Sequence, residues 1–179
     1  MSRQLRWMLA VVCVLILAAA AWEVQRVAAA PILPEKSSLP DEVLCLRNVQ
    51  EVRVVAGSVP PLLIKAGLNA ARIEGMVREQ LKKARFNAEG GENAPQLVMY
   101  ILAVEDVDLP GVVNIVAFLE VNQDVRVIRL DNKTMNLPTS TLFSFKSAKP
   151  DRLEAPAQRV VEDAVSQFIH AVDSATRAG

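Results

Sequence analysis

The sequence contains few of the residues that most catalytic and metal-binding sites use. Its 179 residues include one histidine, His170, and two cysteines, Cys13 and Cys45. Because zinc sites take three or four ligands, mostly cysteine and histidine, this supply excludes a zinc centre of the usual type. The chain also lacks the G-x-S-x-G nucleophile elbow, the G-x-G-x-x-G loop and the phosphate-binding loop. We therefore expect no cofactor and no bound metal.

The two cysteines also exclude a disulfide framework. Cys13 lies inside an apolar N-terminal run, which leaves Cys45 alone in the rest of the chain. Cys13 is a poor site for lipid attachment, because Val12 precedes it where a small residue is needed. Cys45 lies between Leu44 and Leu46, and we expect it to be a small buried hydrophobe.

Aromatic residues and excess positive charge are scarce too. Aromatic residues make up 4% of the chain, and its formal net charge is zero. Three of the 20 basic and one of the 20 acidic residues lie before residue 30, so the remainder carries a net charge of −2. Proteins that bind nucleic acids usually show a basic face, often with stacking aromatic side chains. We expect no nucleic-acid partner.

The N-terminal segment carries the clearest signal in the sequence. Arg3 and Arg6 precede the apolar run WMLAVVCVLILAAAAW (7–22), and small residues follow up to Ala30. This order is typical of a secretory signal that is cut after Ala29 or Ala30. The run is shorter than the ~20 residues that span a bilayer comfortably, but an uncleaved anchor stays open. We interpret residues 1–29 as a signal peptide or N-terminal membrane anchor, and the rest as exported, periplasmic or extracellular.

The exported part divides into a linker and one domain. Residues 30–40 contain three prolines and two serines, a composition that predicts an extended linker. Residues 41–179 are enough for a single α+β domain with a real core. The membrane is then reached only through the N-terminal segment.

Hydrophobic alternation predicts four strands in this domain. The pattern places them at 51–57, 96–104, 113–130 and 139–146. Residues 96–104, QLVMYILAV, are apolar on both faces and predict a central strand that is covered on both sides, or at least half-covered.

Steps of three and four between apolar residues predict two helices. The first occupies about 70–84 with Asn69 as its N-cap, and the last begins with Pro156 in its first turn. Prolines predict a loop over 58–67, and turn residues predict connections at 105–111 and 131–138.

The order β-α-β-β-β-α predicts an α+β fold, a two-layer sandwich. Its first two strands should be parallel through a right-handed crossover, and the last three should form a meander. The sheet is therefore mixed, mostly antiparallel and four-stranded. Since each helix has one apolar stripe, both helices should pack on one face of the sheet.

The strand 113–130 contains a polar residue in an apolar row. Leu119, Val121, Val125 and Val127 share one face with Gln123. The unbroken phase favours one continuous strand over a hairpin at Asn122-Gln123. Eighteen residues would span roughly 60 Å, whereas a domain of this size has a radius of gyration of about 14 Å. The strand must coil or project, and we expect the Gln123 amide to meet backbone groups or water there.

The opposite row of this strand carries the candidate site. Glu120, Asn122, Asp124 and Arg126 alternate along one face and form a candidate partner surface. Glu120 and Asp124 could also serve as dispersed catalytic carboxylates. Asn132 begins an N-x-T sequon, which matters only where exported proteins are glycosylated.

The order of segments also resembles a known group of proteins. The quoted pattern comprises GLNAARIEGMVREQLKKA (67–84), QLVMYILAV (96–104) and FLEVNQDVRVIRL (118–130), before a short strand and a final helix. It is similar to small bacterial envelope accessory proteins, namely the lipoprotein that assists lipopolysaccharide assembly and auxiliary components of ABC-type exporters. The resemblance implies an envelope protein that works beside larger machinery.

Three functions stay open at this level. The first is a non-catalytic exported protein that acts through contact with a protein partner in the envelope, as an assembly or transport accessory. The second is a small-ligand or lipid-binding module with a groove between sheet and helices. The third is an enzyme that uses dispersed carboxylates. The residues give no indication of the oligomeric state.

Overall fold

The computed structural model describes residues 39–178. The predicted signal or anchor over 1–29, and the predicted linker as far as residue 38, lie outside these residues. The helices within the described part are α2 (Asp41–Leu44), α3 (Pro61–Lys65), α4 (Ala70–Lys83) and α5 (Glu154–Arg177). The strands are β1 (Arg53–Ala56), β2 (Gln96–Glu105), β3 (Val113–Val127) and β4 (Lys133–Ala148). Two 3₁₀ turns, Ile128–Leu130 and Pro150–Arg152, follow β3 and β4.

The four strands form one mixed sheet in the order β1-β2-β3-β4. β1 pairs with β2 in parallel, and β2, β3 and β4 form an antiparallel meander. The predicted α+β class, sheet composition and strand order are confirmed.

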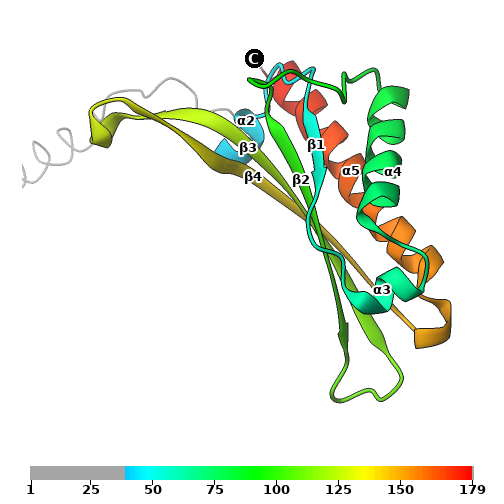
Figure 1. Ribbon diagram of the computed structural model, residues 1–179. Helices are drawn as coiled ribbons and strands as arrows, with labels where there is room; N and C mark the ends of the chain where they lie inside the picture. The colour runs from blue at the N-terminus through cyan, green and yellow to red at the C-terminus, as the bar shows by residue number, and fades with distance from the viewer. Residues whose placement is uncertain (1–38, 179) are drawn as a thin grey trace, which may run out of the picture. The chain divides into compact units, whose positions relative to one another are not determined.

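Both long helices lie on the same face of this sheet (Figure 1). Asn69 caps α4 by accepting the amide of Arg72 at 2.9 Å, as predicted. Pro156 lies in the first turn of α5, where its missing amide costs no helical hydrogen bond. Buried side chains fill the space between the layers, among them Ile73 and Leu81 of α4, Phe168 of α5 and Ile115 of β3.

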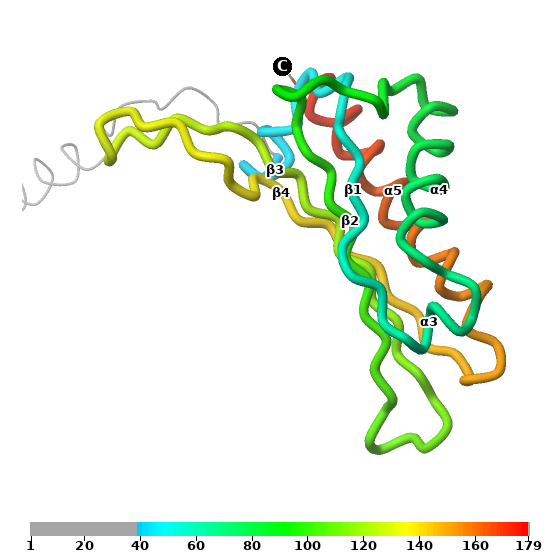
Figure 2. Tube along the Cα trace, viewed as in Figure 1, coloured from blue at the N-terminus to red at the C-terminus, as the bar shows by residue number. Residues whose placement is uncertain are grey.

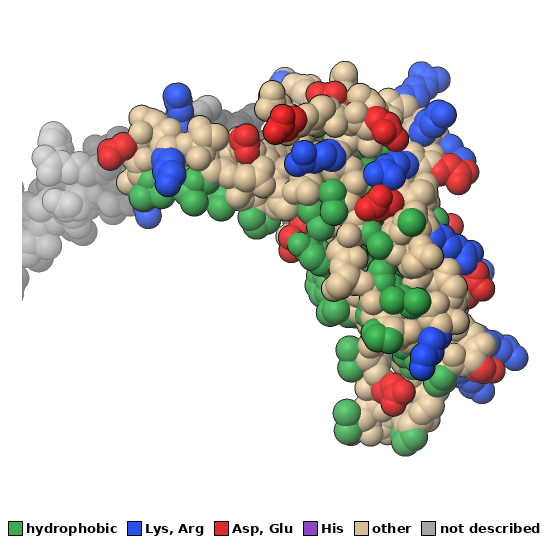
Figure 3. All heavy atoms as spheres, in the orientation of Figure 1, with side chains coloured by type: hydrophobic (Ala, Val, Ile, Leu, Met, Phe, Trp, Pro, Cys, Tyr) green, Lys and Arg blue, Asp and Glu red, His purple; other side chains and the backbone are tan. Residues whose placement is uncertain are grey.

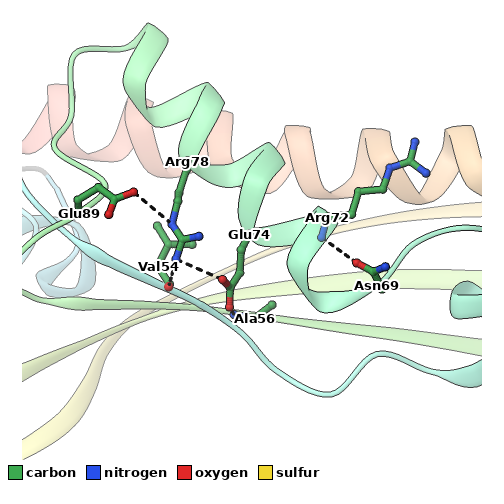
Figure 4. Close-up of polar contacts among 7 residues, drawn as sticks. All are labelled: Val54, Ala56, Asn69, Arg72, Glu74, Arg78 and Glu89. Atoms are coloured by element: carbon green, nitrogen blue, oxygen red, sulfur yellow. Dashed lines mark hydrogen bonds and ion pairs between the residues drawn. The ribbon is translucent and has the colours of Figure 1, made fainter.

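Side chains of α4 close the free edge of β1 (Figure 4). Glu74 Oε1 accepts the amide of Ala56 at 3.1 Å, and Arg78 Nη2 donates to the carbonyl of Val54 at 3.3 Å. The same Arg78 nitrogen lies 3.2 Å from Glu74 Oε2. Because unpaired edge groups invite pairing with another strand, these contacts protect one side of the sheet.

Two predicted connections are wrong. Residues 58–67 contain α3, because Pro61 occupies the first helical turn, where proline is favourable. Residues 133–138 of the predicted turn belong to β4, which tolerates Pro138 since it is an edge strand. The predicted strand 139–146 is accordingly only part of β4.

The long strand β3 is continuous and runs beyond the rest of the sheet (Figure 2). β2 accompanies it only as far as the pair Gln96–Asn122, so the later part pairs with β4 alone. We call this two-stranded extension, residues 122–138, the arm. Gln123 Nε2 donates to the backbone carbonyl of Cys45 at 3.2 Å. The prediction that its amide meets a backbone group where the strand leaves the core is confirmed.

The irregularity at this point lies in β4 and not in β3. Val121 pairs with Ser140 and Asn122 with Pro138, so Thr139 is an extra residue. Its hydroxyl donates to the carbonyl of Val121 at 3.0 Å. Because the extra residue lies in β4, side chains continue to alternate between the two faces along β3. In β4 this alternation shifts by one residue at Thr139.

Candidate interaction surface

The face of the sheet opposite the helices carries a block of apolar side chains. Tyr100, Phe118 and Phe143 are cross-strand neighbours in one row of β2, β3 and β4. Leu102, Val116 and Phe145 form the next row. We call these six residues the open face.

The four open-face residues that lie on β2 and β4 are exposed to solvent. The exposed fraction is 40% for Tyr100, 48% for Leu102, 60% for Phe143 and 68% for Phe145. Figure 3 shows hydrophobic side chains gathered over the strands and down to the hairpin that joins β2 and β3. At about 200 Å² for a whole aromatic side chain, the three exposed aromatic residues alone leave roughly 340 Å² in solvent. The largest apolar patch on a typical soluble monomer covers ~300–600 Å² and is often functional. These three residues alone reach that range, so the open face is a candidate contact surface.

The position of Tyr100 is fixed by Gly57, the residue that follows β1. A Cβ atom at Gly57 would lie 2.6 Å from Tyr100 Cδ1 and 3.0 Å from Cε1. The ring therefore lies against the backbone of Gly57 and cannot stay there if that residue gains a side chain. Only glycine allows this approach.

The predicted surface residues Glu120, Asn122, Asp124 and Arg126 share the same side of β3 as the open face but extend away from it. Glu120 lies one row beyond Phe118, beside Val98 and Thr141. Asp124 and Arg126 are exposed on the arm, and Asn136 Nδ2 donates to Asp124 Oδ1 at 2.9 Å. The four residues therefore form a line and not a cluster.

Asn122 and Asp124 also line a polar hollow of about 250 Å³ where the arm leaves the sheet. Gln123, Asn136 and Cys45 contribute to its wall. Cys45 is half-buried there, with Sγ 3.2 Å from the carbonyl oxygen of Thr139. Burial raises the pKa of the Cys45 thiol, against the opposing effect of its hydrogen bond at Thr139. The expected buried hydrophobe is thus a partly exposed residue that holds the base of the arm.

The geometry does not favour paired-carboxylate chemistry at Glu120 and Asp124. Four residues of extended strand separate their Cα atoms by roughly 13 Å, whereas glycosidase carboxylates, for example, act across ~5–9.5 Å. His170 is exposed on α5. Within residues 39–178, no group of three or more histidine, cysteine, aspartate or glutamate side chains is placed to hold a metal ion.

The β2–β3 hairpin is ordered by its own polar contacts. Asp106 Oδ1 accepts the amides of Asp108 at 2.9 Å and Leu109 at 3.1 Å, and Asn114 Nδ2 donates to Asp106 Oδ2 at 2.9 Å. The hydrogen bonds from Asn114 and from the amide of Asp108 lower the pKa of Asp106. Val107, 93% exposed, and Leu109, 58% exposed, extend the apolar surface beyond the open face.

The groove expected for a ligand-binding module would lie between sheet and helices, where core side chains fill the space. The hollows of the described part lie at its periphery. One of about 840 Å³ is bounded by α3 and the start of α5, and another of about 440 Å³ by the C-terminal ends of α4 and α5. Both are open to solvent.

The sequence analysis missed the open face although its signal was present. Thr141, Phe143 and Phe145 alternate with Leu142, Ser144 and Lys146, so one face of β4 had to carry two phenylalanines. Their register opposite Phe118 and Tyr100 was needed to show that the aromatic residues meet.

Comparisons with known proteins give only distant similarity. No family model and no curated protein matches the chain. Among solved structures, a minor lipoprotein from Acinetobacter baumannii aligns with 9% identity and a TM-score of 0.45, covering 72% of this chain and 93% of its own. A candidate lipoprotein from Caulobacter crescentus CB15 aligns with 14% identity and a TM-score of 0.29, covering 75% and 93%. Neither likeness is close enough to transfer a role to any residue. No helix in the described part is long and apolar enough to cross a membrane.

Proposed function

We propose that this protein is a non-catalytic, exported binding domain that acts through contact with a protein partner in the cell envelope. The observation that carries the proposal is the open face, where Tyr100, Phe143 and Phe145 are exposed although the helices pack on the other face of the sheet. Fully burying an aromatic side chain is worth roughly 1.5–3 kcal/mol. A partner that covers this face gains the share of that free energy that belongs to the exposed fraction of each side chain.

The N-terminal sequence supports export. The order of basic, apolar and small residues over 1–29 is typical of a secretory signal or anchor. The partner is then an envelope component, consistent with a role in assembly or transport. The line of Glu120, Asn122, Asp124 and Arg126 supplies a polar border for the contact, as interfaces usually have.

Two matched leucine substitutions test the proposal. Leu102 lies on the open face and Leu130 at the tip of the arm, and their exposed fractions are 48% and 51%. Envelope extracts from cells that make each full-length variant are separated by native gel filtration, and the size of the complex that contains the chain is measured. We expect Leu102→Ser to move the chain to a smaller species and Leu130→Ser to leave it unchanged. Loss of the complex in Leu130→Ser alone would place the contact on the arm and contradict the proposal.

A further inference from the structure

The charges around the open face indicate what kind of partner covers it. From Gln96 to Val125 the chain contains five carboxylates and no lysine or arginine. This stretch includes β2, the hairpin and most of β3, which form the centre of the open face. The facing stretch of β4, Thr141–Phe145, is uncharged.

Carboxylates lie beyond the two rows of the open face in both directions along the strands. Glu120 borders the row of Phe118, and Asp106 and Asp108 lie in the hairpin beyond Val104. The nearest cation in register is Arg53 of β1, one row beyond Glu120 beside Gln96. Lys146 belongs to the helix side, where its Nζ lies 2.8 Å from Asp163 Oδ2 of α5. The open face is therefore an apolar surface between acidic ends.

Building on the proposed function, we infer that the open face binds an amphipathic helix of the partner protein whose apolar stripe is flanked by lysine or arginine at both ends. Helices already cover the other face of this sheet, and a helix on a sheet is one of the ordinary two-layer arrangements. Glu120 and Asn114, the residue that holds Asp106, are six residues apart on β3, or roughly 20 Å. A helix of about 13 residues spans that distance at ~1.5 Å per residue.

The same charges disfavour two other occupants of the open face, a second copy of this chain and an anionic membrane. In a two-fold dimer the same surface is used by both copies, so acidic ends would face acidic ends or the apolar centre of the other copy. An anionic membrane surface attracts basic segments and would repel this one. A cationic helix gains attraction at both of its ends.

Two synthetic helical peptides with the same leucine and phenylalanine stripe test the inference, one with lysines and one with glutamates at both ends. Their affinity for the full-length chain is measured by fluorescence anisotropy at low and high salt. We expect the lysine-ended peptide to bind about tenfold more tightly, with the difference shrinking as salt rises. In the double variant Glu120→Lys/Asp108→Lys, which changes the net charge of this stretch from −5 to −1, the preference should largely disappear.

A second variant separates this inference from the proposed function. Phe143→Ser/Phe145→Ser changes only exposed side chains, and circular dichroism checks that it folds. If both peptides bind equally well to the native chain but not to this variant, the open face is a binding surface and the charge inference is overturned. If the lysine-ended peptide does not bind, or binds this variant as well as the native chain, the inference is overturned, and the proposed function is decided by the comparison of Leu102→Ser with Leu130→Ser. Self-association in sedimentation velocity, or binding to phosphatidylglycerol vesicles, that Phe143→Ser/Phe145→Ser abolishes would assign the face to another occupant and overturn the inference.

Discussion

Tyr100 shows how a single small residue shapes the proposed contact surface. It is the only tyrosine in the chain, and its ring lies over Gly57 at a distance that no Cβ atom tolerates. The orientation of an open-face residue therefore depends on a neighbour that has no side chain. Glycine is favoured where another group approaches the backbone this closely.

Substitution of Gly57 tests this dependence. Gly57→Ala should displace the Tyr100 ring and lower the free energy of unfolding by about 1 kcal/mol through overpacking. Gly91→Ala is the matched control, because nothing lies within 4 Å of a Cβ atom there. The ring resonances of the single tyrosine report the displacement by NMR. Unchanged resonances in Gly57→Ala would refute the packing described.

Gln123 acts at the same scale where the arm begins. Gln123→Leu removes the donor to the Cys45 carbonyl, and an unmade hydrogen bond at a partly buried site costs about 1 kcal/mol. We expect urea denaturation to show this loss. Gln167→Leu, an exposed position on α5, should change stability by less than about 0.5 kcal/mol. Equal effects of the two substitutions would show that the Gln123 contact contributes nothing specific.

At the scale of elements, the two edges of the sheet are treated differently. Glu74 and Arg78 satisfy the outward backbone groups of β1, while β4 is the other edge strand and carries a bulge and a proline in the arm. Both proline and bulges discourage further pairing. The sheet therefore offers its face for contact more readily than its edges.

The closure of β1 can be tested within one helix. Glu74→Ala removes the acceptor for the Ala56 amide and the partner of Arg78, so the free energy of unfolding should fall by about 1–2 kcal/mol. Glu79→Ala removes only an exposed pair with Lys83, which solvent screens, so its effect should be smaller than that of Glu74→Ala. Chemical denaturation of both variants compares them, and a larger loss for Glu79→Ala would contradict the account.

The β2–β3 hairpin should respond to acid. Because the folded structure lowers the pKa of Asp106, its stabilising effect is fully present above the ordinary aspartate value of about 3.9. That effect is lost as pH falls through the lowered value. We expect the Asn114 side-chain amide and the backbone amides of Asp108 and Leu109 to shift together in NMR at low pH. The transition should vanish in Asp106→Asn and persist in Asp108→Asn; its persistence in Asp106→Asn would assign it to another group.

Much of the element order followed from local chemistry that is visible in the sequence. The Asn69 cap, the apolar stripe of α4 and the unbroken phase of β3 each depend on residues close together in the chain, and each prediction held. The short helix α3 was missed because Pro60 and Pro61 were interpreted as breakers, although Pro61 suits a first helical turn. The length of β4 was missed because the bulge at Thr139 shifts its phase, a change that only the pairing with β3 makes plain.

At the scale of the whole molecule, the described part is a two-layer domain. The helices cover one face of the sheet, and the open face lies on the other side. The helices bury most of the central part of one side of the sheet, and the other side leaves Tyr100, Phe143 and Phe145 exposed. The sequence left this open: helices on one face imply an uncovered face, but the two-sided apolar pattern of residues 96–104 also fits a strand that its own chain covers on both sides. The uncovered side is the reason to expect a partner.

Site-specific photo-crosslinking in cells shows whether a protein partner covers the open face. A photoreactive amino acid is placed at Phe143 or Phe145 of the full-length chain, and at Gln167 of α5 or Ile64 of α3 as exposed controls away from the open face. After irradiation in living cells, crosslinked species are resolved by size and counted for each position. The account predicts one discrete protein adduct from Phe143 and Phe145 and none from Gln167 or Ile64. A discrete adduct from Gln167 or Ile64, with none from Phe143 and Phe145, would show that the open face is not the contact surface.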